Sequence, residues 1–404
     1  MAQVAAVFFP RSRPAGRPPL CSCPPQRLGA MSFCGSREVS HKLESKDSPL
    51  DTEITTGVFK AVKKGTVCRN NPLTVRRRRL EGVMSIVVQN AMDLFVNPRE
   101  VGEKGQQVMR EPDPKAFNYA RAGEDERVTV VSLSLQGRFT GIPVSVFVSV
   151  NPIVRIHAKV VPKCDSLLPH YMTEDLLLYG LCFLEKSTRT DMRLVFDSLA
   201  TRPLINHFHY DAFYLGSTGL AKSRFPIEGV ERAIVSGDLT SGNVSIELLQ
   251  EMQWLARGFV VSAGGKKDDK SLMCRGDIEP LARVSASLIA ELQRRNLPHT
   301  VILCPAVEAR LPKRMTPEMA LSGQVEGVQF PITPEVYILP RSHEDAAGDP
   351  GMLGIELAGL VTARSEELYS STTEADLKSY IGANVTCKDK VFDEILCKAA
   401  WLSN

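Results

Sequence analysis

The run His207-Phe208-His209-Tyr210-Asp211 constrains this chain more than any other stretch, because polar and aromatic residues alternate along it. Such alternation is typical of a half-buried β-strand, since successive side chains of a strand point to opposite faces. The run therefore predicts a strand on which His207, His209 and Asp211 project from one face. Three hydrogen-bonding side chains in a row on a rigid element are a suitable base for a chemical site.

The spacing of the two histidines alone leaves several interpretations open. Histidines on a strand are often structural, each donating to a backbone carbonyl. Imidazoles at positions i and i+2 can also share a zinc ion. No CxxC motif lies near the pair, and Cys182 is distant in the sequence, so we favour a nucleophile over a metal ligand.

Length, charge and cysteine usage limit the class of protein. The 404 residues, 43% of them hydrophobic, suffice for one large core or two domains. A net charge of +3 without a recurring basic face argues against a nucleic-acid partner. No apolar run approaches the roughly 20 residues of a membrane span, and the ten cysteines are mostly scattered, as in a reducing compartment. We therefore expect a soluble cytoplasmic protein with no membrane partner.

The N-terminal residues 1–51 are predicted to be a disordered tail. The first 37 residues contain arginines and clustered prolines but no acidic residue, and too few apolar residues to offset the entropy of ordering. An organellar transit peptide over residues 1–37 and a translated leader upstream of Met31 are the alternatives. We favour a flexible tail on a cytoplasmic protein.

Hydrophobic periodicity predicts the elements around the histidine run. Residues 173–188 carry leucines at helical spacing, with Thr173 as the N-cap and two acidic residues in the first turn. β-Branched runs predict neighbouring strands at 128–135 and 142–150. Similar patterns predict helices at 53–62 and 277–295, and buried strands at 300–303 and 336–341.

The segment 193–215 carries three blocks in a fixed order: Ser198-Leu199, then Ile205-Asn206-His207-Phe208-His209-Tyr210, then Phe213-Tyr214-Leu215. It resembles the histidine-triad superfamily of nucleotide hydrolases and transferases. It is most similar to the GDP-hexose phosphorylases, which comprise the plant GDP-L-galactose and the animal GDP-D-glucose enzymes. Their segment runs N-S-L-G, then I/V-N-H-L-H-φ-Q/H, then Y-Y-L, where φ is hydrophobic.

Two further segments extend the resemblance. Residues 113–119 are similar to the family's D-x-x-K/Q-F-N-F, which makes Lys115 and Asn118 candidates for nucleotide contact; a loop leading into a strand is the alternative. Residues 150–162 match φ-S-P-x-x-x-G-H-φ-L-φ-φ-P, with His157 on the histidine. Ile156 replaces the glycine, so the turn must be shaped differently there. The four arginines at 76–79 are interpreted as a solvated surface or a localisation signal, with a role near phosphates as the alternative.

The resemblance covers most of the chain and implies its architecture. It implies an α+β fold of two histidine-triad-like halves, each an antiparallel sheet with packed helices. The catalytic half is placed at residues 52–220 and the second half, which would cover the site, at residues 235–404. The block Glu356 to Val361 matches the family's E-x-x-G-x-φ in that second half.

The resemblance also implies a chemistry. The second histidine of the H-x-H pair is the superfamily nucleophile, and it falls on His209. It would displace hexose 1-phosphate from GDP-hexose and form a guanylyl-histidine, from which inorganic phosphate releases GDP; His207 would orient the site. No metal and no cofactor are implied, and a homodimer is one option for assembly. The implied substrate-binding residues are Asp211, Asn206, Asp197, Ser198, Lys115, Asn118 and His157.

Three further positions depart from the family pattern. Asp197 replaces asparagine, Ala200 replaces glycine, and Asp211 replaces a glutamine or histidine that can donate to phosphate. Each carboxylate within about 4 Å of a phosphate costs on the order of 4 kcal/mol. The carboxylate of Asp211 must therefore be protonated, turned away or paired, with the arginines at 189, 193 and 202 as candidate partners. A nucleotide-binding relative without turnover and a nucleotide-sugar hydrolase are the alternative functions.

Overall fold

The computed structural model describes residues 47–402, except 66, 69–70, 92–105, 203, 237–243, 251–252, 264–277, 306–333 and 344–350. The tail predicted over residues 1–51 thus lies almost wholly outside the described residues. Helix α1 (Pro49–Lys64) already begins at Pro49, where the side chain of Ser48 accepts a hydrogen bond from the backbone N–H of Asp51. No helix among the described residues is both long and apolar enough to cross a bilayer.

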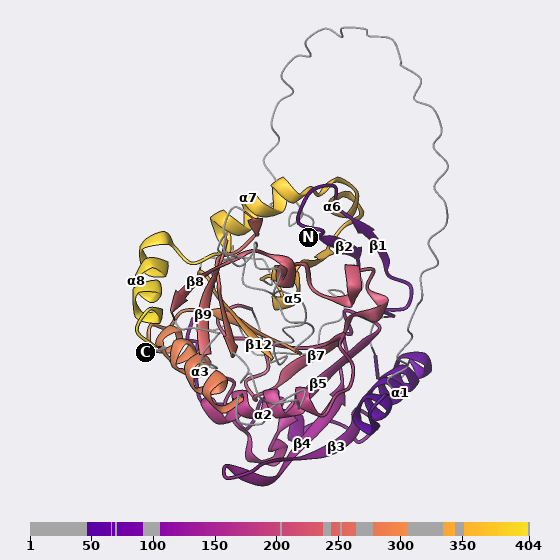
Figure 1. Ribbon diagram of the computed structural model, residues 1–404. Coiled ribbons are helices and arrows are strands. Elements are labelled where there is room, and N and C mark those ends of the chain that lie inside the picture. Colours follow the sequence, from indigo (N-terminus) through magenta and orange to yellow (C-terminus); the bar gives the residue numbers. More distant parts are fainter. Residues whose placement is uncertain are drawn as a thin grey trace, which may run out of the picture. The chain divides into compact units, whose positions relative to one another are not determined.

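One sheet of ten strands, in which every neighbouring pair is antiparallel, organises the structure (Figure 1). In spatial order the strands are β3 (Arg127–Leu135), β4 (Phe139–Val148), β5 (Ile156–Pro162), β7 (Tyr210–Tyr214), β6 (Met192–Asp197), β11 (His299–Cys304), β12 (Glu335–Pro340), β10 (Phe259–Ala263), β9 (Val244–Leu249) and β8 (Arg232–Ser236).

The sheet consists of two halves with the same topology. Each half runs along the chain as three strands, a helix and two strands: β3, β4, β5, α2 (Glu174–Glu185), β6, β7, and then β8, β9, β10, α3 (Ile278–Arg294), β11, β12. The halves join where β6 pairs with β11, with Asp197 opposite Thr300. The predicted α+β fold of two antiparallel halves with packed helices is confirmed. The boundary between residues 220 and 235 stays a prediction.

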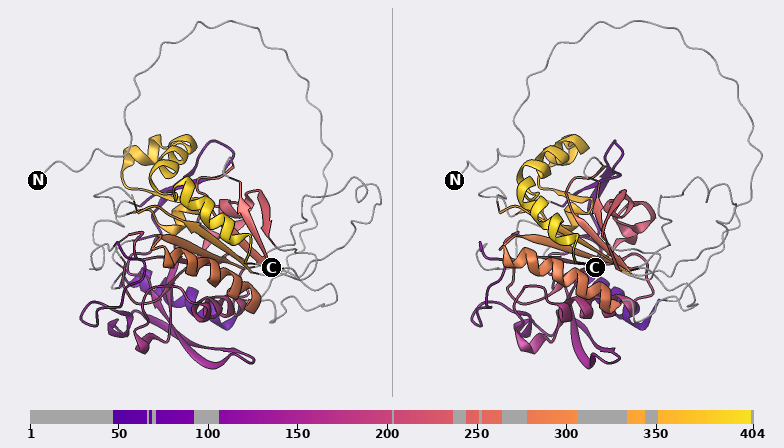
Figure 2. Two further views of the ribbon diagram at one scale, coloured as in Figure 1. Left: turned by 90° about the vertical axis from the view of Figure 1, so that its left-hand side faces the viewer. Right: turned by 60° about the vertical axis from the view of Figure 1, so that its left-hand side comes forward.

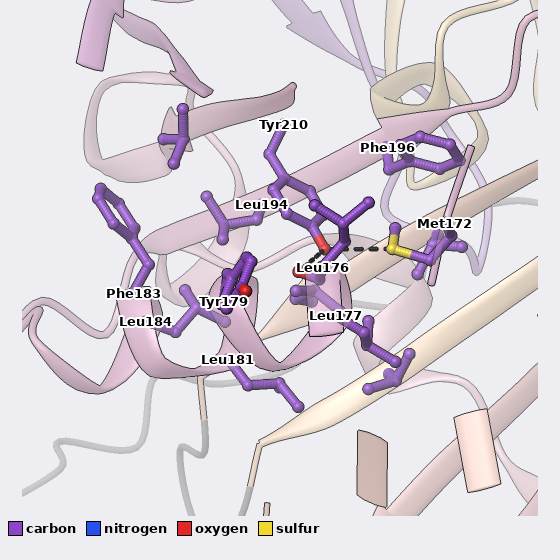
Figure 3. Packing of buried hydrophobic residues seen from close by; sticks show 14 of the residues in the cluster. Met172, Leu176, Leu177, Tyr179, Leu181, Phe183, Leu184, Leu194, Phe196 and Tyr210 are labelled. Atoms are coloured by element: carbon purple, nitrogen blue, oxygen red, sulfur yellow. Dashed lines mark hydrogen bonds between the residues drawn. The ribbon is translucent and has the colours of Figure 1, made fainter. Parts of the chain in front are cut away.

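Among the described helices, four cover one face of the sheet, namely α1, α2, α3 and α8 (Asp389–Ala399). Helix α1 packs on β3 to β5, and α3 and α8 lie side by side over the second half (Figures 1 and 2). The predicted helix at 173–188 is observed as α2, and its expected N-cap, Thr173, accepts a hydrogen bond from the N–H of Leu176. The apolar residues of α2 lie against Phe196 and Tyr210, whose hydroxyl is 3.0 Å from the Leu176 carbonyl oxygen (Figure 3).

The opposite face is covered by a second, three-stranded sheet and short helices. That sheet has the order β1 (Arg76–Arg79), β2 (Val87–Asn90), β13 (Leu360–Ala363), and the helices are α5 (Gly354–Leu357), α6 (Glu366–Ser371) and α7 (Glu374–Asn384). The four-arginine run is strand β1: Arg76 pairs with Glu366, and Arg78 donates to the carbonyl of Thr372. These two arginines therefore have structural contacts with the C-terminal segment. Short 3-10 turns connect the elements at Tyr119–Arg121, Cys164–Ser166, Leu215–Ser217, Ala221–Ser223 and Pro226–Gly229.

Candidate active site

The histidine run lies at the start of β7, but it is not itself the predicted strand. Strand β7 begins at Tyr210, and His207 and His209 lie in the connection that leads into it. The reason is backbone pairing, because the N–H of Phe208 donates to the carbonyl of Leu168, 2.7 Å away, and not to β5. The predicted alternation holds from there on: Tyr210 joins the helix-side core, and Asp211 joins the polar cluster described below.

His207 is fixed in one tautomer by the turn that begins at Tyr119. The Tyr119 backbone N–H donates to Nδ1 of His207 over 3.0 Å, so the ring proton is on Nε2. This Nε2 is buried and has no hydrogen-bond partner among the described residues. Burial lowers the pKa of His207 to about 4, which makes it a neutral, unused donor at pH 7.

His209 is held in the opposite tautomer. Its Nδ1 lies 2.8 Å from the backbone carbonyl oxygen of His207, and because a carbonyl only accepts, Nδ1 carries the proton. Nε2 therefore has a free lone pair. The ring stacks on His170, with centroids 4.5 Å apart. Burial, helped by the nearby charge of Lys159, lowers the pKa of His209 well below its usual value. The imidazole is thus unprotonated at neutral pH, as a nucleophile must be.

The Asp211 carboxylate is paired. His157 accepts a hydrogen bond from the N–H of Ile153 at Nδ1, so its Nε2–H donates to Asp211 over 2.6 Å. The Lys159 ammonium donates to the same carboxylate oxygen, and Arg202 lies 4.0 Å from the other. Burial alone would raise the pKa of Asp211, but Lys159 and His157 outweigh it and hold this pKa well below the usual range.

The main charged partner of Asp211 is Lys159 and not one of the three arginines predicted from the sequence. Arg193 is buried against Glu228, and Arg189 forms a bidentate pair with Asp191. Of the three predicted arginines, only Arg202 lies beside the carboxylate. The prediction of Arg189 and Arg193 as partners was wrong, because each has a closer acid that is not in the motif.

Asp197 and Ser198, two predicted substrate contacts, lie at the junction of the halves. Asp197 accepts hydrogen bonds from the Thr300 hydroxyl, 2.6 Å away, and from the Gly354 backbone N–H, 2.9 Å away. Ser198 Oγ accepts from the N–H of His299 over 2.8 Å. Both side chains are buried, and these contacts hold β6 against β11 and α5 of the second half.

The remaining predicted contacts divide between loop anchors and an exposed residue. Asn206 donates to the carbonyls of Arg110 and Glu111 and accepts from the N–H of His170, so it anchors the loops around the histidines. Asn118 is buried at the start of the turn that positions His207. Lys115 is exposed. The substrate contacts assigned to these residues stay predictions.

Lys159, His170 and Arg202 complete the polar cluster around His209. Lys159 had a signal in the sequence, because it follows His157 by two positions and shares its strand face; His170 had none. Nδ1 of His170 and Nε of Arg202, like Nε2 of His207, are buried without a hydrogen-bond partner within the described ranges. Buried polar atoms are normally satisfied, so each of these three atoms is a candidate contact for a polar ligand. No group of three or more potential metal ligands was found in the described part.

Two solved structures have an overall fold similar to that of this chain. The crystal structure of yeast Ap4A phosphorylase Apa2 in complex with Ap4A is similar over 82% of this chain and 95% of that chain, with a TM-score of 0.50 and 12% identity. A second crystal structure of yeast Ap4A phosphorylase Apa2 has a TM-score of 0.50 over 85% of this chain and 96% of that chain, at 13% identity. The chain therefore shares the overall fold of these Ap4A phosphorylase structures.

Sequence comparison shows which proteins the chain is similar to. Residues 50–213 match the family model of the GDPGP1-like N-terminal domain. GDP-L-galactose phosphorylase 2 of Arabidopsis thaliana is 23% identical over 209 residues, which is 48% of this chain but 44% of the relative's length. GDP-D-glucose phosphorylase 1 of Danio rerio is 22% identical over 269 residues, 67% of each chain. Residues 50–213 thus match the GDPGP1-like N-terminal domain, and the resemblance to the GDP-hexose phosphorylases is confirmed.

Proposed function

We propose that the chain is a GDP-hexose phosphorylase, which converts GDP-hexose and inorganic phosphate into hexose 1-phosphate and GDP. The observation that carries this proposal is the tautomer of His209. Its Nδ1 proton is held by the His207 carbonyl, so the lone pair of Nε2 is available without prior loss of a proton. The names of the relatives, which are phosphorylases of GDP-sugars, support the choice of substrate class.

The reaction would proceed by two displacements at the α-phosphorus. Nε2 of His209 attacks, the bond from the α-phosphorus to the bridging oxygen breaks, and hexose 1-phosphate leaves with that electron pair. An oxygen of inorganic phosphate then attacks the guanylyl-histidine. The phosphorus–nitrogen bond breaks, its electron pair returns to Nε2, and GDP is released.

The neighbouring groups support this chemistry by positioning and charge, on which phosphoryl transfer mainly depends. The neutral His207 would donate its unused Nε2–H to a phosphate oxygen. Asp211 and Asp197 have partners in the protein, so neither carboxylate acts as a bare charge on the substrate. This favours an active enzyme over a relative that binds nucleotide without turnover. A homodimer and a cytoplasmic location stay predictions.

The test is turnover of GDP-glucose, GDP-mannose and GDP-L-galactose by the purified full chain, with and without phosphate. Without phosphate, the wild type should form a guanylyl adduct that mass spectrometry detects. His209→Asn should abolish both this adduct and turnover. It should leave GDP affinity within about tenfold, since binding is spread over phosphate, ribose and base. His343→Asn, which removes an exposed imidazole, is the matched control.

Each alternative function gives a different result. Equal activity of His209→Asn and the wild type would remove His209 from the mechanism. Release of GMP and hexose 1-phosphate at the same rate without phosphate would identify a hydrolase. GDP binding with no turnover of any of these substrates would identify a nucleotide-binding relative.

A further inference from the structure

Two opposite charges face each other on neighbouring strands beside His209. Lys159 of β5 lies directly opposite Asp211 of β7 in the antiparallel register, and its ammonium donates to the carboxylate. Both side chains are mostly removed from water, with exposed fractions of 16% for Lys159 and 9% for Asp211. They form a buried ion pair in the region of the proposed nucleophile.

Both residues stand where the superfamily pattern has neutral ones. The pattern H-φ-L-φ-φ-P places leucine at the position of Lys159, and the motif places glutamine or histidine at that of Asp211. Lys159 alone would bury a charge without its partner, and Asp211 alone would keep only the more distant Arg202, 4.0 Å away. Each replacement alone is therefore destabilising, whereas the two together neutralise each other. Because β5 and β7 pair in this register, Lys159 lies opposite Asp211 and the two charges compensate each other.

The Lys159–Asp211 pair also supplies the hydrogen-bond donor that an aspartate alone lacks. Glutamine and histidine can donate a hydrogen bond to a phosphate oxygen, but an ionised aspartate only accepts. An ammonium carries three donors. The carboxylate of Asp211 uses one, and no other acceptor for Lys159 is found among the described residues. The remaining donors are thus available to an anionic ligand next to His209, whose pKa the Lys159 charge helps to lower.

We propose that the Lys159–Asp211 pair replaces the phosphate-binding third residue of the motif: the Lys159 ammonium binds a phosphate oxygen of the nucleotide, and Asp211 positions that ammonium. The inference rests on the proposed function for the identity of the ligand. Lys159 is the substrate-binding member, and Asp211 acts through it. The phosphate would thus be contacted by a charged ammonium, where the family pattern has a neutral glutamine or histidine.

The test is a four-member cycle of wild type, Lys159→Leu, Asp211→Gln and the double variant, which carries the family's residues at both positions. GDP and guanosine are the probes, because they differ only by the diphosphate. Lys60→Leu, an exposed lysine on α1, removes the same charge elsewhere and is the control. Thermal melts of every variant separate loss of fold from loss of binding.

Lys159→Leu should weaken GDP binding at least 100-fold, since it removes the donor and leaves the carboxylate facing the phosphate, while guanosine affinity changes less than threefold. The double variant should regain GDP affinity to within tenfold of wild type, because glutamine donates directly. Lys60→Leu should change neither affinity.

A pair that serves only the fold gives a different pattern. Lys159→Leu would then lower the melting temperature but leave the ratio of GDP to guanosine affinity unchanged, and this would overturn the inference. If the wild type binds GDP with this dependence on Lys159 but turns over no GDP-hexose, the proposed function fails and the inference stands. A wild type that does not bind GDP would overturn both.

Discussion

Acidification from pH 8 to pH 5 should destabilise this protein strongly, because its fold buries five histidines in neutral form. Burial lowers the pKa to about 4 for four of them and well below the usual value for His209. The four are His157, His170, His207 and His299. Each is neutral in both states at pH 8. As the pH falls below about 6.5, the unfolded chain gains protons that the folded protein does not, and unfolding becomes more favourable.

The pKa values give the size of the effect. One histidine with a pKa of about 6.5 unfolded and about 4 folded lowers the unfolding free energy by about 2 kcal/mol at pH 5, so the four together lower it by about 8 kcal/mol. Glu356 acts in the opposite direction: burial raises its pKa to about 7, so it takes up its proton mainly in the folded protein and raises the unfolding free energy at pH 5 by about 2–3 kcal/mol. The net loss is about 5–6 kcal/mol, comparable to the whole stability of many domains.

Urea unfolding at pH 8 and pH 5 measures this loss, with fluorescence of the buried Trp254 and far-UV circular dichroism as probes. His299→Asn removes one buried titrating group outside the proposed chemistry. The unfolding free energy of this variant should therefore fall by about 2 kcal/mol less than that of the wild type between pH 8 and pH 5. His343→Asn is the matched exposed control and should behave as the wild type. A wild-type loss under about 1 kcal/mol, or an equal loss in His299→Asn, would refute the reasoning.

Three further predictions test other parts of the structure. In Gly354→Ala the new Cβ would lie 2.8 Å from Asp197 Oδ1, so thermal melts should show a loss of about 1–3 kcal/mol, and an unchanged melting temperature would contradict the packing described. Arg193→Leu strands the buried Glu228 and should cost about 3–5 kcal/mol in urea unfolding; a cost below about 1 kcal/mol would argue against the pair. Because the pKa of His209 is depressed by burial, kcat/KM for GDP-hexose should stay level between pH 6 and 8, whereas an apparent pKa near 6.5 would show a solvated nucleophile.

Local signals were enough to predict most of the elements. The leucine spacing and the Thr173 cap define α2, because both act within one or two turns of chain. The β-branched runs predict β3 and β4 to within a few residues. The histidine pair was found because its spacing is part of a motif. Its strand assignment was wrong, since the hydrogen bond from Phe208 to Leu168 that ends the ladder depends on a loop far away in the sequence.

The partners of the charged residues could not be predicted in the same way. Lys159 and Asp211 are 52 positions apart, and only the pairing of β5 with β7 brings them together. The same holds for Asp197, whose partners Thr300 and Gly354 lie 103 and 157 positions away. Periodicity assigns a residue to a face of its own strand, but the neighbouring strand is set by topology.

The two acidic departures from the family therefore have different physical reasons. Asp197 accepts hydrogen bonds from β11 and from the N-terminal end of α5, so its charge holds the two halves together behind the site. Asp211 meets a lysine on the adjacent strand and faces the proposed nucleophile. The Arg202 guanidinium lies between them, 3.6 Å from one carboxylate and 4.0 Å from the other. One arginine thus screens both acids and links the junction of the halves to the candidate site, and a change at Asp211 alters the field at His209.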